Sequence, residues 1–82
     1  MRTSVTARKA LTYLLPKLIE GGPSDRDLHL LRRVTDSLRH DYRMNYEAVY
    51  SLASEVVAPA FLERPVWDGL LMQCDSLPQE GQ

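Results

Sequence analysis

The chain has a single cysteine, Cys74, among 82 residues. A disulfide within the chain is therefore excluded, and the lone thiol agrees with a cytoplasmic protein. The only histidines, His29 and His40, lie eleven residues apart and do not form a metal-ligand motif. No uncharged run approaches the ~18–20 residues of a membrane span. A chain this small usually needs a disulfide, a metal ion or a partner for stability. Since the first two are not supported, we expect a homodimer or a complex with a larger protein.

The sequence also lacks the motifs that carry most enzyme chemistry. It has no Gly-rich phosphate loop, nucleophile elbow or zinc-binding spacing. Residues 21–24, GGPS, resemble an anion-binding helix start, but ending one helix and beginning the next explains them as well. His29 and His40 fall in Arg-rich segments and are expected on the surface. The sequence therefore predicts a non-enzymatic protein with no catalytic residue, no cofactor and no metal.

The two halves of the chain carry opposite net charges, because acids are the minority in the first half and bases in the second. Residues 1–43 hold nine Lys/Arg and five Asp/Glu, a net +4, whereas residues 44–82 hold one and six, a net −5. A basic half can steer toward an acidic protein, toward nucleic acid, or toward the acidic half of a second copy. The acidic second half favours a protein partner over nucleic acid.

Strand signals are nearly absent, and helical periodicity dominates. Apolar residues recur at helical spacing in three successive segments, led by Ala7-Leu11-Leu14-Leu15-Leu18, Leu28-Leu31-Val34 (or Thr35)-Leu38, and Tyr46-Val49-Ala53-Val56. The sequence predicts an all-α fold, a small irregular bundle of four or five short helices. Residues 1–75 form one helical domain, and residues 76–82 a flexible tail.

Local signals place the helix ends. Pro16 predicts a kink or break near Leu14-Leu15, because proline removes a helical hydrogen bond. Ser24 to Asp27 fit a capping box at a helix start. Pro59 predicts an end or a kink near Val57, and Pro65 suits the first position of a last short helix.

The segment 31–52, LRRVTDSLRHDYRMNYEAVYSL, fits one long helix or two. Neither Pro nor Gly interrupts it, so a single helix from Asp25 to Val57 is one interpretation. Asn45 is a good N-cap, however, and the net charge changes sign at Met44. We therefore predict two helices with a corner at Arg43–Asn45.

Aromatic residues are few and suggest an interface. Tyrosine and tryptophan are favoured at interfaces because they combine contact area with a polar tip. Methionine adds adaptable apolar surface, and arginine adds charge. The predicted partner-binding residues are Tyr42, Tyr46, Tyr50, Trp67, Met44, Arg39 and Arg43. For any single tyrosine, ordinary core packing is the alternative, whereas Trp67 is the residue we most expect at a partner contact.

Nucleic acid is the second hypothesis for the partner. Helix 25–43 presents Arg32, Arg33 and Arg39, which predicts a dimeric DNA-binding regulator as the alternative function. The net charge over residues 25–43 is only +1, from five Arg and four Asp. A groove-reading helix normally keeps its basic residues less neutralised.

The segment 24–52 resembles the helix pair after the wing of MerR-type regulators and their chaperone-modulator relatives. In these families, a D-L-x-x-L-x-x-I/V pattern leads through a G-M-N/D-hydrophobic junction into a second helix. The matching residues are Asp27, Leu28, Leu31, Val34, Met44, Asn45, Tyr46, Ala48 and Val49. Residues 1–22 lack the family's recognition-helix motif, and residues 21–23, GGP, replace its wing residues. The resemblance thus implies a two-helix geometry, and a protein partner, as in the chaperone-modulator branch, in place of an operator.

Overall fold

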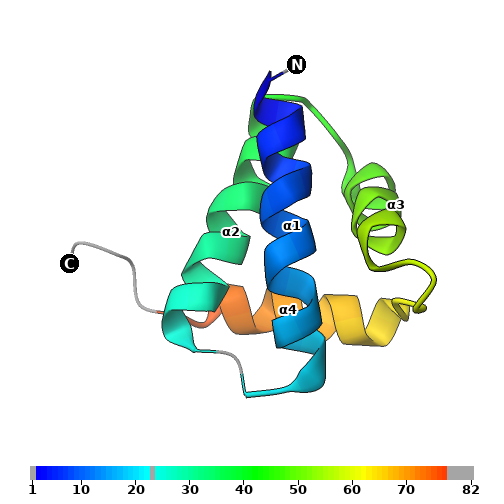
Figure 1. Ribbon diagram of the computed structural model, residues 1–82. Coiled ribbons are helices and arrows are strands. Elements are labelled where there is room, and N and C mark those ends of the chain that lie inside the picture. Colours follow the sequence, from blue (N-terminus) through cyan, green and yellow to red (C-terminus); the bar gives the residue numbers. More distant parts are fainter. Residues whose placement is uncertain (1, 23, 78–82) are drawn as a thin grey trace.

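In a computed structural model the described part of the chain forms four helices, labelled α1 (Arg2–Glu20), α2 (Asp25–His40), α3 (Tyr46–Val57) and α4 (Arg64–Asp75). The structure describes residues 2–22 and 24–77, with side chains from residue 6 onward. Helices α1 and α2 run antiparallel, α3 packs beside α1, and α4 crosses the lower end of the pair (Figure 1). The predicted all-α bundle is confirmed. Of the predicted tail, residues 78–82 lie outside the described residues, while Leu77 packs against the core.

All four helices contribute to one hydrophobic core. The largest side chains that are almost fully buried come from α1, α2, α4 and the loop before α4. They are Leu11, Leu14, Leu15, Leu31, Leu38, Leu62 and Trp67. Val49 and Ala53 extend the core along α3. Burial of each large side chain stabilises the fold by about 1.5–3 kcal/mol, so these few residues dominate its stability.

The sequence predicted a kink or a break near Leu14-Leu15. Helix α1 continues through Pro16, so the break is wrong. Pro16 is exposed, while Leu14, Leu15 and Leu18 around it are buried. A proline inside a helix costs about 3 kcal/mol. Burial of the three leucines together exceeds that cost, and they can be buried together only if the helix stays intact. Tertiary packing therefore overrides the local signal.

Helix α2 buries Thr35, one of the two residues predicted for this position of its buried stripe. The buried residues of α2 are Leu28, Leu31, Thr35 and Leu38, and Val34 is only half-buried. The Thr35 hydroxyl donates to the carbonyl of Arg32 at 3.1 Å, which satisfies it inside the helix. Val34 is consequently left at the edge of the core.

The corner predicted at Arg43–Asn45 is confirmed. Arg43 adopts a left-handed backbone with φ 56°, and the Met44 N–H donates to the Leu38 carbonyl at 3.1 Å. Glycine adopts this conformation readily, and the MerR-type junction that residues 24–52 resemble has glycine at the position of Arg43. The Asn45 side chain accepts from the Ala48 N–H at 2.8 Å and so begins α3. Short-range backbone chemistry therefore makes the turn.

Other predicted helix ends are also confirmed. The Ser24 hydroxyl accepts from the Asp27 N–H at 3.2 Å at the start of α2. Helix α3 ends at Val57, and Pro65 is the second residue of α4, one position later than predicted.

We expect Asn45→Ala to lower the free energy of unfolding by about 1 kcal/mol, because the Ala48 N–H loses its acceptor. Urea denaturation followed by circular dichroism measures this change. Asn45→Asp is the control, since it keeps a side-chain acceptor and should stay close to the wild type. An equal loss in both variants would contradict the capping role.

Candidate functional site

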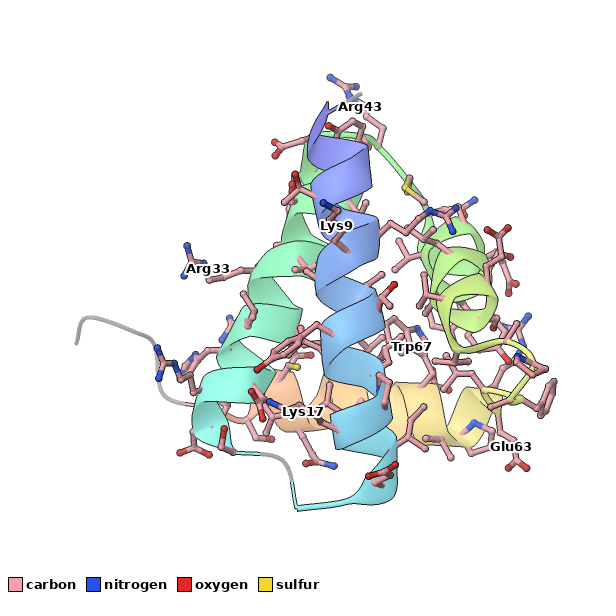
Figure 2. All side chains as sticks on the ribbon, viewed as in Figure 1. Lys9, Lys17, Arg33, Arg43, Glu63 and Trp67 are labelled. Atoms are coloured by element: carbon pink, nitrogen blue, oxygen red, sulfur yellow. The ribbon has the colours of Figure 1, made fainter. Side chains whose placement is uncertain are left out.

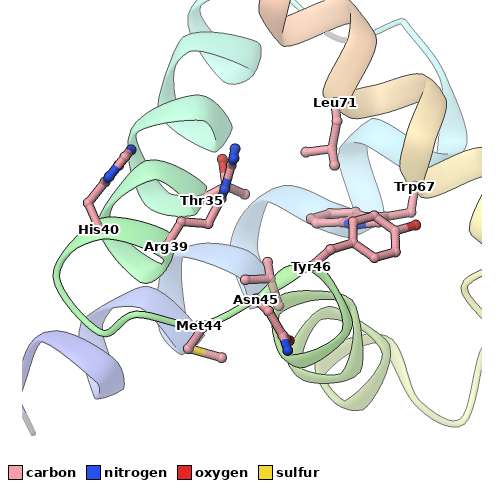
Figure 3. A pocket seen from close by; sticks show the side chains of 9 residues that line it. Thr35, Arg39, His40, Met44, Asn45, Tyr46, Trp67 and Leu71 are labelled. Carbon is pink, nitrogen blue, oxygen red and sulfur yellow. The ribbon is translucent and has the colours of Figure 1, made fainter.

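A pocket of about 420 Å³ opens where the end of α2, the corner, α3 and α4 meet (Figure 3). We call it the three-helix pocket. Its lining residues are Thr35, Arg39, His40, Met44, Asn45, Tyr46, Val49, Trp67 and Leu71. Ligand pockets in proteins commonly combine such apolar surface with a few polar groups.

The walls of the three-helix pocket differ in chemistry. Leu71 supplies half-buried apolar surface from α4, with the buried Val49 and Trp67 behind it, and Met44 adds a flexible thioether from the corner. Arg39 and His40 stand exposed on the last turn of α2. The pocket therefore suits an apolar group that is followed by a negative charge.

Trp67 is a core residue, so its predicted exposure at a partner contact is wrong. Its side chain has 0% exposure. A small domain has few large apolar side chains, and the largest one stabilises the fold most when it is buried. Its indole Nε1–H has no hydrogen-bond partner among the described residues. Such an unpaired buried donor lowers the stability of the fold by about 1–3 kcal/mol.

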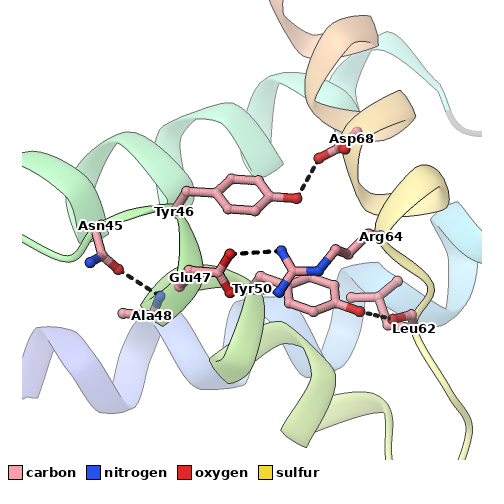
Figure 4. Close-up of polar contacts among 8 residues, drawn as sticks. All are labelled: Asn45, Tyr46, Glu47, Ala48, Tyr50, Leu62, Arg64 and Asp68. Carbon is pink, nitrogen blue, oxygen red and sulfur yellow. Dashed lines mark hydrogen bonds and ion pairs between the residues drawn. The ribbon is translucent and has the colours of Figure 1, made fainter.

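Two of the predicted tyrosines join α3 to α4 (Figure 4). The Tyr46 hydroxyl donates to the Asp68 carboxylate at 2.5 Å, and the Tyr50 hydroxyl donates to the Leu62 carbonyl. The two rings stack with centroids 6.3 Å apart. The Arg64 guanidinium lies 4.6 Å from the Tyr50 centroid. Both hydroxyls are thus engaged inside the molecule.

An ion pair completes this cluster. Arg64 contacts both oxygens of the Glu47 carboxylate, at 2.6 and 2.9 Å. The hydrogen bonds from Arg64 lower the pKa of Glu47, and the hydrogen bond to Asp68 raises the pKa of Tyr46. The pair is exposed, so its contribution to stability is modest. Arg64 also lies 5.7 Å from the centroid of the Tyr46 ring, which lines the pocket.

The structure brings together four of the seven predicted partner-binding residues. Arg39, Met44, Tyr46 and Trp67 line the three-helix pocket. Tyr42 is half-buried against the core, Tyr50 bonds to the loop before α4, and Arg43 is exposed at the corner.

Sequence reasoning missed several residues of the pocket, namely Thr35, His40, Asn45, Val49 and Leu71, as site residues. The sequence did predict Asn45 as a helix cap and Val49 as a core residue. No local signal marks Leu71 or Thr35, since only the packing of α4 against α2 brings them together.

The three arginines predicted to contact nucleic acid do not share one surface. Arg39 lines the three-helix pocket, whereas Arg33 lines a groove between α1 and α2. Six residues separate them, which places them about 120° apart around the helix. Arg32 is half-buried, and its charge acts on Cys74 of α4. Arg33 therefore lies away from the side of α2 that carries Arg39.

Cys74 is a structural residue. It is buried, and its thiol donates to the Leu28 carbonyl at 3.3 Å, which links α4 to the start of α2. Burial raises the pKa of the Cys74 thiol to about 11, so the reactive thiolate is scarce at neutral pH.

The described residues contain neither a metal-binding cluster nor a membrane-spanning helix. In residues 2–22 and 24–77, no group of three or more His, Cys, Asp and Glu side chains is placed to hold a metal ion. None of the helices described has the length and apolar character needed to cross a membrane.

Comparisons with protein families, curated proteins and solved structures find no match to this chain. The resemblance of residues 24–52 to the MerR-type helix pair stays a prediction.

Proposed function

We propose that this chain is a non-enzymatic adaptor or modulator that binds a larger protein. The partner inserts an apolar side chain into the three-helix pocket and places a carboxylate beside Arg39 and His40. The observation that carries this proposal is the pairing of apolar walls with two exposed basic side chains at one opening.

The properties of the pocket residues support a protein ligand. Buried interface anchors are commonly apolar or aromatic side chains surrounded by polar rims. Met44 can adjust its shape to the inserted group, while Trp67 behind it is held rigidly by the core. Arg39 can pair with a carboxylate through two parallel hydrogen bonds, which gives orientation as well as affinity.

We expect Arg39→Glu to lower recovery of the main partner about tenfold, equivalent to about 1.4 kcal/mol. The measurement is affinity purification from the native host with quantitative mass spectrometry. Arg33→Glu is the matched control, because it makes the same charge change on an exposed arginine of the same helix, away from the pocket. The partner lost with Arg39→Glu should be retained with Arg33→Glu.

The alternative, DNA binding, gives a different result. It predicts that both variants lose binding, that nuclease treatment removes the captured material, and that affinity for duplex DNA falls steeply with salt. Equal losses in the two variants, or none in Arg39→Glu, would contradict the proposed pocket. Circular dichroism of each variant checks that the helices remain.

A further inference from the structure

The face of α2 that packs beside α1 carries a second concave surface. We call it the α1–α2 groove, and it has a volume of about 320 Å³. Its lining residues are Thr6, Ala7, Ala10, Leu30, Arg33, Val34 and Ser37. None of these residues lines the three-helix pocket, so the two surfaces are separate.

The floor of the groove is apolar. On α1 it is formed by the small side chains of Ala7 and Ala10, and on α2 by the half-buried Leu30 and Val34. Leu30 and Ser37 lie seven residues apart, or about 10 Å along the helix. The groove is therefore long enough for about two turns of another helix. Amphipathic helices bind such grooves through side chains at positions i, i+3, i+4 and i+7.

The rim of the groove is basic along its middle. Figure 2 shows Lys9 and Lys17 on the near side of α1 and Arg33 extending from α2. Lys9 and Arg33 are exposed. Acids are also present: Asp27 interacts with Lys17, Asp41 accepts from Ser37 at 3.0 Å, and the exposed Asp36 follows Arg33 by three residues on α2. The middle of the rim nevertheless offers a cation on each helix, Arg33 on α2 and Lys9 on α1.

This charge distinguishes between possible occupants. A second copy that docks through the same groove by two-fold symmetry would bring the cations of one rim against those of the other copy's rim, and like charges at an interface oppose association. A helix with acidic residues on both sides of its apolar stripe would instead pair with Lys9 on one rim and Arg33 on the other. Duplex DNA would use the cations but leave the apolar floor uncovered.

We propose that the α1–α2 groove is a second docking surface, which binds an amphipathic helix with acidic flanks from a protein partner. The helix lays its apolar stripe over Ala10, Leu30 and Val34 and its carboxylates beside Lys9 and Arg33. This inference is independent of the three-helix pocket: the acidic helix belongs to a second partner, whose loss with Arg33→Glu leaves the partner at the three-helix pocket bound. With both surfaces occupied, the chain holds two protein segments on different faces of α2.

Two phage-displayed libraries of helical peptides of about 14 residues, or four turns, test the proposal on the full chain. Both carry apolar residues at positions i, i+4, i+7 and i+11, but one has Asp and Glu at the flanking positions and the other has Lys and Arg. We expect enrichment of the acidic library only. Fluorescence anisotropy then measures the affinity of the best acidic peptide for the wild type and for three variants.

Arg33→Glu and Ala10→Leu are each expected to weaken that peptide at least tenfold. The first reverses a rim charge, and the second fills the groove with an apolar side chain that a helix tolerates. Arg39→Glu is the matched control and should leave the affinity within twofold. It also separates the two proposals, since it tests the three-helix pocket alone.

Several outcomes would overturn the groove proposal. These are no enrichment, equal enrichment of both libraries, or peptide binding that survives Arg33→Glu and Ala10→Leu. Displacement of the peptide by duplex DNA at low micromolar concentration would assign the basic rim to nucleic acid. A dimer in analytical ultracentrifugation that dissociates with Ala10→Leu would assign the groove to a second copy.

Discussion

Trp67→Ala is expected to lower the free energy of unfolding by about 3–5 kcal/mol, because it removes a large side chain from the core. Trp67 has 0% exposure and is the only tryptophan. A domain of this size has a stability of only several kcal/mol, so the variant should be largely unfolded at 37 °C. Urea denaturation followed by circular dichroism is the suitable measurement, since the variant has no tryptophan fluorescence.

Trp67→Phe separates the contribution of packing from that of the unpaired indole N–H. The phenyl ring keeps most of the apolar contact and removes a donor that has no partner. We expect a loss below about 2 kcal/mol, because the small cavity is partly offset by removal of the unpaired group. If Trp67→Ala instead remained as stable as the wild type, Trp67 would not belong to the core.

Pro16→Ala is expected to raise the free energy of unfolding by about 2 kcal/mol. Alanine restores an N–H that can donate to the Thr12 carbonyl and removes the ring clash, a gain of about 3 kcal/mol in a helix interior. Loss of proline's restriction of the unfolded chain offsets about 1 kcal/mol of that gain. Pro16 is exposed, so no core contact is lost. The melting temperature should rise by about 4–8 °C per kcal/mol.

Pro65→Ala is the matched control for this prediction. It makes the same chemical change in the first turn of α4, where an N–H has no helical acceptor. We expect no gain in stability, and a small loss through the freer unfolded chain. Equal stabilisation by both substitutions would show that the effect does not come from the interior position of Pro16.

The two corrections to the sequence-based predictions share one cause. Pro16 opposes a helix locally, yet α1 continues because it must keep Leu14, Leu15 and Leu18 in the core. Trp67 lies in a short helix with a weak local pattern, yet it is buried because α4 crosses the other helices. In both places, contacts between residues far apart in sequence outweigh the signal of the nearest neighbours.

The candidate site was predictable only in part, for a related reason. Arg39, Met44 and Tyr46 lie near the corner in sequence, so their neighbourhood follows from the turn itself. Leu71 joins them from α4, and no local pattern indicates that approach. The tyrosines were predicted to form an interface. In the structure the Tyr46 hydroxyl bonds to Asp68 of α4 and the Tyr50 hydroxyl bonds to Leu62 in the loop before α4. The sequence shows that a tyrosine needs a partner but does not show which one.

By itself, the sequence determined the helical class, the corner at Arg43–Asn45 and the caps at Ser24 and Asn45. These features depend on hydrogen bonds and apolar spacing within a few residues, which the order of residues specifies directly. Only the tertiary structure decided that α1 continues through Pro16, that Trp67 is buried, and that Arg33 and Arg39 face different surfaces. Those outcomes depend on how the helices cross, and the crossing is set by the packing of the whole core.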